Sequence, residues 1–284
     1  MKFLSFKTSE SAPATWGLVD GTDAVDLGAI HTPRFPDLKS VIAAGALSEV
    51  ASKAGEASRY PLAGILWLPL IGNPDKILCI GLNYETHRKE TGRSEVEHPT
   101  VFTRFANSQT GHLTDIIRPR VSHDLDFEGE LAVVIGKPGR YIARDRAFDH
   151  VAGYSLYNDG SVRDFQRHTH QFTPGKNFPH TGGFGPWLMT PDELGPLGAL
   201  RLQTRINGQV VQQATLDQMI FDIPRQIEYC STFTRLEPGD VIATGTPGGV
   251  GAKRTPPLWL KPGDKVEIEL DRLGVLENGV ADEG

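Results

Sequence analysis

Residues 126–136 read DFEGELAVVIG, and the rest of the chain is best interpreted outward from this stretch. Its second half is a short apolar run, rich in β-branched residues and closed by glycine, which is typical of a buried strand. Strand side chains alternate between two faces, so Asp126, Glu128 and Glu130 are predicted to point the same way. Three carboxylates on one face of a hydrophobic strand repel one another and resist the loss of water.

Two explanations of these acids are open from the stretch alone. A bound hard cation would relieve the repulsion, because Mg²⁺ and Ca²⁺ take oxygen ligands. An exposed strand end, with its acids solvated or paired with arginine and lysine, would relieve it equally well. The stretch itself favours neither explanation, so the choice depends on the rest of the chain.

The composition indicates a β-rich protein that binds no nucleic acid. The 284 residues include 31 glycines and 20 prolines, which favours many strands and turns. The formal charge is -6 with acids and bases interspersed, whereas nucleic-acid-binding proteins carry a basic stripe. No apolar run approaches ~18 residues and no signal-peptide pattern is present, so we expect a soluble cytoplasmic protein with no membrane partner. The two cysteines lack metal-ligand spacing and suit a reducing compartment.

The chain is predicted to divide into two domains. The apolar stretch 62–74 is punctuated by prolines and is interpreted as the boundary. We therefore expect a small N-terminal α+β domain over residues 1–72 and a larger domain over residues 73–284.

Patterns within the first domain predict strands and a helix. Residues 2–8 alternate like a strand, and Asp20-Gly21 between two short apolar runs indicates a hairpin. Residues 37–57 have apolar side chains at helical spacing, with Gly45 weakening the middle of the predicted helix.

A short polar helix follows the next buried strand. Residues 76–81 form that strand, and a Leu-Asn-Tyr loop leads to residues 85–90, closed by Gly92. His87 and Glu90 are three positions apart and therefore share one helical face. A carboxylate beside an imidazole orients it and raises its basicity, as a general base for water requires. An ordinary surface ion pair explains the spacing better on its own, although functional sites gather at such strand ends.

Another buried strand, over residues 151–157, is followed closely by Asp159. Two glycine-rich loops come later, at 181–186 and 244–251. Such loops let the backbone approach a ligand, but they also occur as simple tight connections. The second loop lacks the lysine and the spacing of a phosphate-binding P-loop.

Taken together, these motifs resemble the fumarylacetoacetate hydrolase family over roughly residues 76–271. Each motif is weak alone, but their joint order and spacing match the family. The matching blocks are Ile80-Gly81-Leu82-Asn83-Tyr84 with His87 and Glu90, the stretch 126–131, Asn158-Asp159 with Arg163-Asp164 and Gln166, Gly175-Lys176, Gly185-Pro186-Trp187, Pro238-Gly239-Asp240 and Thr244-Gly245-Thr246-Pro247.

The resemblance implies an α+β, mostly β fold, with a mixed β-sandwich roll of the family's C-terminal type, a small N-terminal domain and a homodimeric assembly. It also implies a divalent cation, commonly Mg²⁺, with Mn²⁺ or Ca²⁺ as alternatives. The family's three carboxylate ligands correspond to Glu128, Glu130 and Asp159. Asp126 is not carried over as a ligand.

The same resemblance implies roles for other residues. Acylpyruvase-like members place a histidine–glutamate pair on a short helix that closes over the site, and His87 and Glu90 match this pair. Lys176 matches a lysine that contacts the substrate oxyanion. Positions of the substrate pocket correspond to Asn83, Tyr84, Arg163, Gln166 and Thr246.

The chain departs from the family in two places. After Lys176, many members have Ser-Phe-Asp-Thr, whereas this chain has Asn177-Phe178-Pro179-His180. Many members have a lysine where this chain has Arg104. Both changes are predicted to lie at the pocket rim, so the substrate is less well defined than the fold or the metal.

The sequence therefore predicts a metal-dependent hydrolase that cleaves a carbon–carbon bond in a 1,3-diketo acid, such as an acylpyruvate, fumarylpyruvate or diketo sugar acid. His87, oriented by Glu90, would activate water, and Lys176 would meet the oxyanion. Alternatives with the same metal and enolate chemistry are an oxaloacetate-type decarboxylase and a hydroxydienedioate isomerase or hydratase. A non-catalytic protein that only binds a metal or a keto acid would need neither a general base nor a lysine. The presence of His87, Glu90 and Lys176 together argues against such a protein. A purely structural role fits each motif singly and the whole set poorly.

Overall fold

The computed structural model describes all 284 residues and places β11 (Gly129–Ile135), the apolar half of the opening stretch, among buried strands. Strand β11 pairs antiparallel with β12 (Val151–Asp159) on one side and with β17 (Val241–Ala243) on the other. Every residue of β11 is buried, as its unbroken apolar run predicts for a strand covered on both faces.

The large sheet of the molecule has twelve strands and is built around β11. Two short strands lie off its main path: β5 (Leu66–Trp67) pairs with β1 (Lys2–Lys7), and β8 (Gln109–Thr110) pairs with β14 (Gly182–Met189). From edge to edge the main path contains β4 (Arg59–Pro61), β3 (Asp23–Asp26), β2 (Thr15–Asp20), β1 (Lys2–Lys7), β14 (Gly182–Met189), β12, β11, β17, β6 (Ile77–Gly81) and β7 (Thr100–Arg104).

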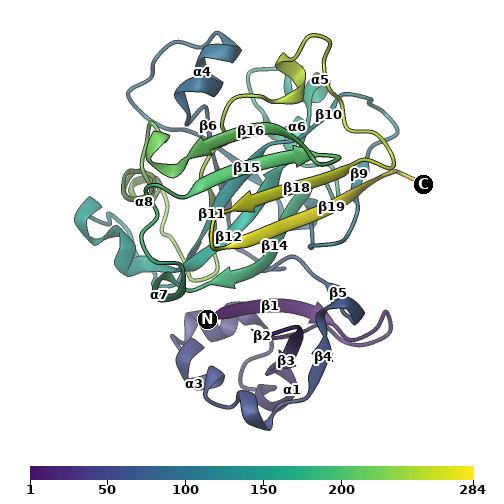
Figure 1. The fold of residues 1–284 in the computed structure, drawn as a ribbon. Helices are drawn as coiled ribbons and strands as arrows, with labels where there is room; N and C mark the ends of the chain where they lie inside the picture. The colour runs from purple at the N-terminus through teal and green to yellow at the C-terminus, as the bar shows by residue number, and fades with distance from the viewer.

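A second sheet of five strands packs against the C-terminal part of the first (Figure 1). A small separate pair is formed by β10 (Leu125–Asp126) and β13 (Ser161–Val162). The five strands, in order, are β16 (Gln209–Thr215), β15 (Arg201–Ile206), β18 (Lys265–Leu270), β19 (Gly274–Asp282) and β9 (Ile116–Arg118). This mostly β arrangement of two packed, mixed sheets confirms the predicted fold class.

Alternation along β11 links two hydrophobic cores. Leu131, Val133 and Ile135 belong to the core that includes residues of the second sheet, such as Ile268. Ala132 and Val134 face the other way, into a core that also contains Phe3 and Trp16. Ala132 and Val134 continue the even-numbered positions of Glu128 and Glu130. The side chains at these positions therefore point away from the second sheet.

The opening stretch is not one continuous strand, because β10 ends at Asp126 and β11 begins at Gly129. The two backbone amides between them are bound by side chains instead of by a neighbouring strand. Phe127 N donates to Asp126 Oδ1 at 2.8 Å, and Glu128 N donates to Asn158 Oδ1 at 2.9 Å. This local break sets the position of Glu128.

The N-terminal segment extends the large sheet, because β1 pairs antiparallel with β14. The predicted strand at 2–8 is confirmed as β1, and the predicted hairpin is confirmed as β2 and β3. The single predicted helix over 37–57 is wrong: the chain forms α2 (Leu38–Ala43) and α3 (Leu47–Ala51), because Gly45 adopts φ +62° between them. The division between residues 72 and 73 stays a prediction, and the core of Phe3 and Trp16 is shared across it.

The remaining helices are short apart from one. The longer one, α8 (Ile223–Phe233), is preceded by the cap Asp222, whose carboxylate accepts a hydrogen bond from Arg225 N. None of the helices combines the length and the apolar composition that a membrane-spanning segment needs. The helices are α1 (Gly28–His31), α4 (Glu85–Thr91), α5 (Arg163–Gln166), α6 (Thr173–Lys176), α7 (Pro191–Leu194) and α8 (Ile223–Phe233).

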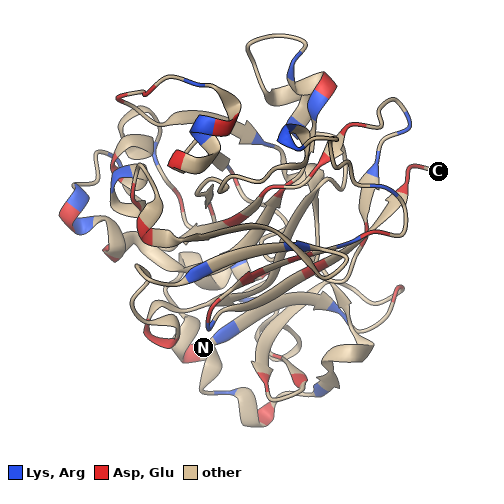
Figure 2. Ribbon diagram, turned by 45° about the horizontal axis from the view of Figure 1, so that its top comes forward, with Lys and Arg blue, Asp and Glu red and all other residues tan.

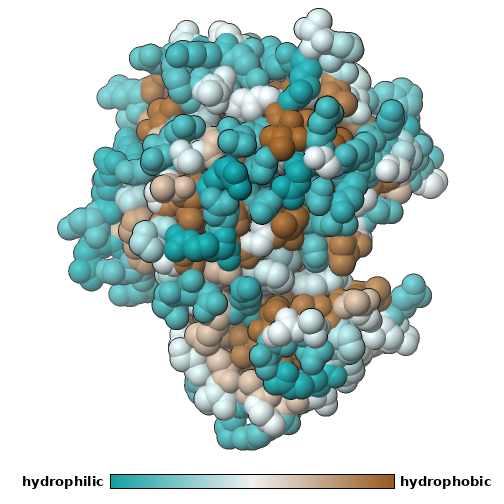
Figure 3. Space-filling model, in the orientation of Figure 1, coloured by the Kyte–Doolittle hydropathy of each residue, from teal (hydrophilic) through white to brown (hydrophobic).

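Charges of both signs are interspersed along the chain, as the composition predicts (Figure 2). The face drawn in Figure 3 is mostly hydrophilic, with hydrophobic patches broken up by polar residues. Helices α4, α5 and α6 gather at one end of the two sheets, at the top of Figure 1. This end contains the site described next.

Candidate active site

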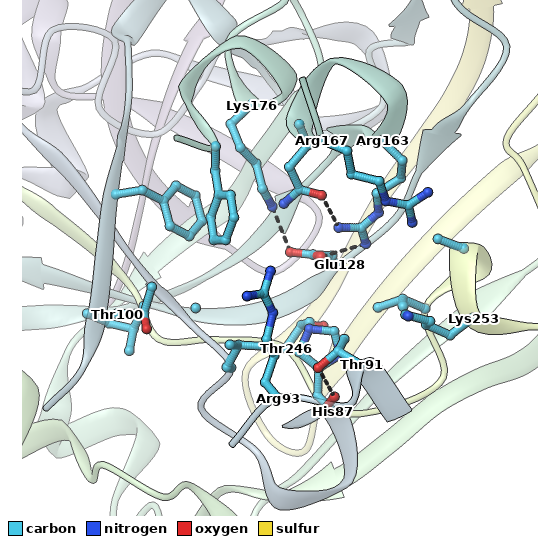
Figure 4. A pocket seen from close by; sticks show the side chains of 18 of the residues that line it. His87, Thr91, Arg93, Thr100, Glu128, Arg163, Arg167, Lys176, Thr246 and Lys253 are labelled. Atoms are coloured by element: carbon cyan, nitrogen blue, oxygen red, sulfur yellow. Dashed lines mark hydrogen bonds and ion pairs between the residues drawn. The ribbon is translucent and has the colours of Figure 1, made fainter. Parts of the chain in front are cut away.

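A cavity of about 830 Å³ opens at the end of the sheets where α4, α5 and α6 gather (Figure 4). Its wall comes from α4 and the segment after it, from β7, from the connection between α5 and α6, and from the loop that follows β17. These segments are far apart in sequence. The cavity is therefore assembled by the fold and has the size of ordinary small-molecule sites.

Three carboxylates lie together at the cavity. One oxygen from each of Glu128, Glu130 and Asp159 lies within 4.8 Å of the others. The exposed fractions of these residues are 5%, 2% and 0%. Antiparallel pairing of β11 with β12 brings them together, since Gly129 is opposite Asn158 and Asp159 N donates to Glu128 O at 2.9 Å. The explanation by an exposed, solvated strand end is therefore wrong.

Buried cations neutralise two of these acids. Lys176 Nζ lies 2.8 Å from Glu128 Oε2 and 2.6 Å from Asp159 Oδ2. Arg104 Nη1 donates to Asp159 Oδ1 at 2.8 Å, and Arg163 Nη2 lies 2.6 Å from Glu128 Oε1. The pairing with arginine and lysine that the sequence left open is thus present inside the protein.

These pairs fix the charge states of their members. Burial disfavours the charged form of Glu128, but the charges of Lys176 and Arg163 outweigh it and hold the pKa of that carboxyl below its ordinary value. Burial likewise opposes the charge on Lys176, and the Asp159 and Glu128 carboxylates overcome it, so the pKa of the ammonium is raised. Lys176 is consequently a cation at neutral pH.

Glu130 differs because no lysine or arginine pairs with it. Its Oε2 accepts a hydrogen bond from Gly245 N at 2.8 Å. Burial, together with the charges of Asp159 and Glu128, raises the pKa of Glu130 well above its ordinary value. A divalent cation would supply the missing positive charge, and the all-oxygen donor set is the one that Mg²⁺, Mn²⁺ and Ca²⁺ prefer. The residues present therefore fit such an ion.

Asp126 lies outside this group of acids. Its carboxylate accepts hydrogen bonds from Arg163 Nε at 2.8 Å and from the amides of Gly251 and Ala252 at 2.8 and 2.9 Å. Asp126 thus holds both the arginine that contacts Glu128 and the loop that forms one side of the cavity.

His87 is presented to the cavity by α4. Its Nδ1 lies 2.7 Å from Glu90 Oε1, and Glu90 Oε2 accepts from Gly249 N at 2.9 Å. The side chains are 8% and 22% exposed, so an ordinary surface pair does not describe them. A carboxylate accepts hydrogen bonds but donates none, so the hydrogen between these two groups belongs to His87 Nδ1. His87 Nε2 is then the nitrogen that can act as a base. Gly92 ends the helix in the left-handed conformation, as predicted.

Three of the predicted pocket residues line the cavity: Arg163, Gln166 and Thr246. Arg163 Nη1 donates to Gln166 Oε1 at 3.0 Å, so Arg163 orients the side chain of Gln166. Thr246 Oγ1 donates to Gly129 O at 3.0 Å, which fixes the loop against the start of β11.

Asn83 and Tyr84 do not line the cavity, which contradicts the pocket contact predicted for them. The Asn83 amide donates to Phe221 O and Thr244 O, and it accepts from Phe221 N. Tyr84 packs in the main core, where burial raises the pKa of its hydroxyl. Leu82, which precedes them with φ +59°, is on the cavity wall instead.

The two departures from the family pattern do not lie at the pocket rim, contrary to prediction. Arg104 is buried behind Asp159 and also donates to Thr181 Oγ1 at 2.8 Å. The Asn177 side chain bonds to the backbone of Thr103 and Phe105, and neither Asn177 nor His180 lines the cavity. Both changes therefore act on the scaffold around the acids.

Several cavity residues were not predicted from the sequence. Exposed cations are hard to distinguish from ordinary surface charge, and only their closeness to motifs signals them. Arg93 comes directly after the helix of His87, and Lys253 follows the second glycine-rich loop. The unpredicted polar members of the wall include Arg93, Thr100, Arg167 and Lys253.

Comparison with known proteins supports the same relationship. A family model described as fumarylacetoacetate (FAA) hydrolase C-terminal matches residues 76–281. A Xenopus laevis protein named oxaloacetate tautomerase fahd2, mitochondrial, is 38% identical over 288 residues, which cover 99% of this chain and 90% of that protein. Oxaloacetate tautomerase YisK of Bacillus subtilis (strain 168) is 43% identical over 251 residues, covering 85% of this chain and 83% of that one.

Solved structures share the fold over their full length. The fumarylacetoacetate hydrolase of Exiguobacterium antarcticum has a TM-score of 0.86 at 32% identity, with both chains covered completely. The maleylpyruvate hydrolase of Sphingobium sp. SYK-6, solved in complex with manganese (II) ion and pyruvate, has a TM-score of 0.83 at 26% identity, again with complete coverage. These similarities extend across the N-terminal segment as well as the rest of the chain.

Proposed function

This chain belongs to the fumarylacetoacetate hydrolase family, and we propose that it interconverts the keto and enol forms of oxaloacetate with the help of Mg²⁺ or Mn²⁺. One observation carries the proposal: an imidazole oriented by a carboxylate lines the same cavity as Lys176 and as Glu128 and Glu130, two members of the acidic triad. The relatives named oxaloacetate tautomerases, one of which matches 99% of this chain, support the choice of substrate.

Glu128, Glu130 and Asp159 would hold the divalent cation, which supplies Lewis-acid polarisation of the keto and carboxylate oxygens when bound. The proton transfer falls to the chain's own residues. His87 Nε2 accepts a proton from the carbon beside the keto group, and the electron pair moves to the keto oxygen. The imidazolium then gives its proton to that oxygen, so the enol forms with no net gain or loss of protons.

Lys176 and Glu90 support this transfer from two sides. Lys176 is a cation held between Glu128 and Asp159, and it donates to the oxygen on which charge develops. Glu90 keeps His87 in the tautomer with a basic Nε2. Neither role needs a water molecule in the reaction.

The test is the rate at which the absorbance of enol oxaloacetate decays at saturating Mg²⁺. We expect His87→Gln to lower the catalysed rate by at least about 10²-fold, the usual contribution of a general acid–base. His123→Gln, at an exposed histidine outside the cavity, is the matched control and should leave the rate unchanged. A near-wild-type rate for His87→Gln would overturn the assignment of His87.

Hydrolysis of an acylpyruvate-type acid is the second candidate. The same His87–Glu90 pair could take a proton from water, and the Sphingobium neighbour is named a maleylpyruvate hydrolase. Analysis of products distinguishes the two reactions, because hydrolysis splits an acylpyruvate into two acids whereas tautomerisation leaves the carbon skeleton intact. Release of pyruvate and carbon dioxide from oxaloacetate would instead indicate decarboxylation.

A further inference from the structure

Arg104 is a buried cation that the proposed chemistry does not use, and it stands at one of the two departures from the family pattern. Most of the N–H groups of its guanidinium donate to neighbouring acceptors. These acceptors are Asp159 Oδ1, Gly160 O and Thr181 Oγ1, each at 2.8 Å, and Ser108 Oγ at 3.3 Å. The contact with Asp159 is therefore part of a network and not an isolated ion pair.

The surroundings of Arg104 hold its guanidinium in place. The side chains of Arg104 and Asp159 are both 0% exposed. Gly182 provides the room, since a Cβ atom at that position would lie 2.8 Å from Arg104 Nη2. The centroid of the Tyr157 ring lies 5.9 Å from Arg104 Cζ. An enclosed guanidinium cannot turn away from Asp159 without leaving buried donors unpaired, which is costly.

Each carboxylate of the triad has one oxygen bound to a donor of the protein. Two of these donors are arginine side chains and the third is a backbone amide. The contacts are Arg104 Nη1 to Asp159 Oδ1 at 2.8 Å, Arg163 Nη2 to Glu128 Oε1 at 2.6 Å, and Gly245 N to Glu130 Oε2 at 2.8 Å. One oxygen of every triad carboxylate is thus already committed to the protein.

The other oxygens of the triad are the ones that a cation can reach. Lys176 Nζ lies 2.8 Å from Glu128 Oε2 and 2.6 Å from Asp159 Oδ2, so these two oxygens face a common point. Figure 4 shows Glu128 in contact with Lys176 and with Arg163. Glu130 Oε1 is the corresponding oxygen of the third acid, because Oε2 is bound to Gly245 N. The triad can therefore offer an ion three oxygens, one from each carboxylate.

We propose that Arg104 determines which divalent cation the triad accepts, because it keeps Asp159 Oδ1 away from the ion and leaves Asp159 a ligand with one oxygen. The inference rests on the proposed function in one respect: it takes the triad to be the cation site. Three single oxygens suit Mg²⁺ and Mn²⁺, which accept an octahedral set with places left for water or substrate. Ca²⁺ takes more oxygens and commonly uses both oxygens of a carboxylate, so the fixed contact disfavours it.

The ratio of two affinities reports this role, whereas a single affinity does not. Removing any cation next to the triad strengthens the binding of every divalent ion, because a repulsive charge is lost. Only a change in the number of oxygens that Asp159 offers alters the preference between a small and a large ion. Arg104 and Lys176 are matched for this comparison, since each contacts a different oxygen of Asp159.

The experiment measures the dissociation constants of Mn²⁺ and Ca²⁺ by calorimetry for wild type, Arg104→Met and Lys176→Met. Both variants lose one positive charge at Asp159, but only Arg104→Met frees Oδ1. We expect the preference of the wild type for Mn²⁺ over Ca²⁺ to shrink at least about tenfold in Arg104→Met. Lys176→Met should bind both ions more tightly and keep the wild-type preference. An equal preference in all three proteins would overturn the role of Arg104.

Crystals of the wild type grown with Ca²⁺ test the same inference without a variant, which matters if Arg104→Met does not fold. We expect Asp159 to bind Ca²⁺ through Oδ2 alone, with Arg104 Nη1 still on Oδ1. Ca²⁺ bonded to both oxygens of Asp159, with Arg104 displaced, would overturn the inference. Failure of the wild type to bind Mn²⁺ at all would instead contradict the metal site of the proposed function, so the two failures are distinguishable.

Discussion

At the scale of single residues, the site has an excess of buried negative charge. Asp126, Glu128, Glu130 and Asp159 are buried together with Arg104, Arg163 and Lys176, and Glu130 is the acid without a basic partner. Such an excess is costly in a protein interior unless a cation binds or a proton is taken up. We therefore expect Glu130 to affect the stability of the metal-free protein, and Lys176 to affect the affinity for the metal.

Metal-free protein should lose stability as the pH rises, because of Glu130. The pKa of Glu130 is raised in the folded state, so the folded protein binds more protons than the unfolded chain. Its contribution to stability is therefore fully present below about pH 4.3, the ordinary value, and is lost as pH rises towards the raised pKa. Glu130→Gln cannot ionise, so its melting temperature in chelator should depend less steeply on pH over this window. Identical pH profiles for the two proteins would contradict this account of Glu130.

Replacing Lys176 should separate metal binding from catalysis. Lys176→Met removes a cation that occupies Glu128 and Asp159, so these acids become available to the ion and Mn²⁺ should bind more tightly. The rate of tautomerisation should nevertheless fall by about 10²-fold or more, because the donor to the developing oxyanion is gone. Mn²⁺ titration by electron paramagnetic resonance measures the first effect. Weaker Mn²⁺ binding by Lys176→Met would show that the ammonium helps to hold the ion.

At the scale of elements, α4 is joined to the loop after β17 through two side chains, Glu90 and Thr86. Glu90 accepts from Gly249 N and contacts His87, so it both orients the base and fixes the helix that presents it. Gly248 N also donates to Thr86 Oγ1 at 3.1 Å. The position of the base thus depends on a contact between two segments that are distant in sequence.

Glu90→Gln should slow the reaction without unfolding the protein. The amide retains an acceptor for Gly249, but a neutral amide no longer stabilises the imidazolium, so we expect kcat to fall by about 10–10²-fold with a smaller change in KM. Unchanged kcat and KM for Glu90→Gln would contradict the orienting role of Glu90.

The sequence was most informative where local pattern and burial agree. The run that became β11, the hairpin of β2 and β3, and the helix closed by Gly92 are encoded by neighbours in the chain. The role of Asn83 and Tyr84 depended on where Phe221 and Thr244 came to lie, which no local pattern specifies. Arg93, Arg167 and Lys253 escaped prediction for a similar reason, since only the assembled cavity distinguishes them from surface cations.

At the scale of the whole molecule, the N-terminal segment and the rest of the chain share a hydrophobic core. Phe3 and Trp16 pack in the same core as Ala132 and Val134 of β11, and β1 continues the large sheet through β14. The sequence placed a boundary after residue 72, but it could not reveal that the two sides are joined by a sheet. The homodimer that the family resemblance implies stays a prediction, which light scattering can check.

A shared core predicts cooperative unfolding. We expect calorimetry to give one transition for the intact chain, because separating the two parts would expose apolar surface of β11 and β14. Phe3→Ala should lower the melting temperature of this single transition, at a cost of about 3–5 kcal/mol typical of a large aromatic side chain removed from a core. Two resolved transitions, of which only one is affected by Phe3→Ala, would instead show that residues 1–72 and residues 73–284 unfold independently.

The central claim is that the buried triad of Glu128, Glu130 and Asp159 is a divalent-metal site within reach of His87. The most direct measurement is the anomalous scattering of crystals grown with Mn²⁺ and oxalate. We expect a single strong manganese peak within bonding distance of one oxygen of each of the three carboxylates, with oxalate between the ion and His87. A manganese peak elsewhere, or no peak at the triad while Lys176 still bridges Glu128 and Asp159, would contradict it.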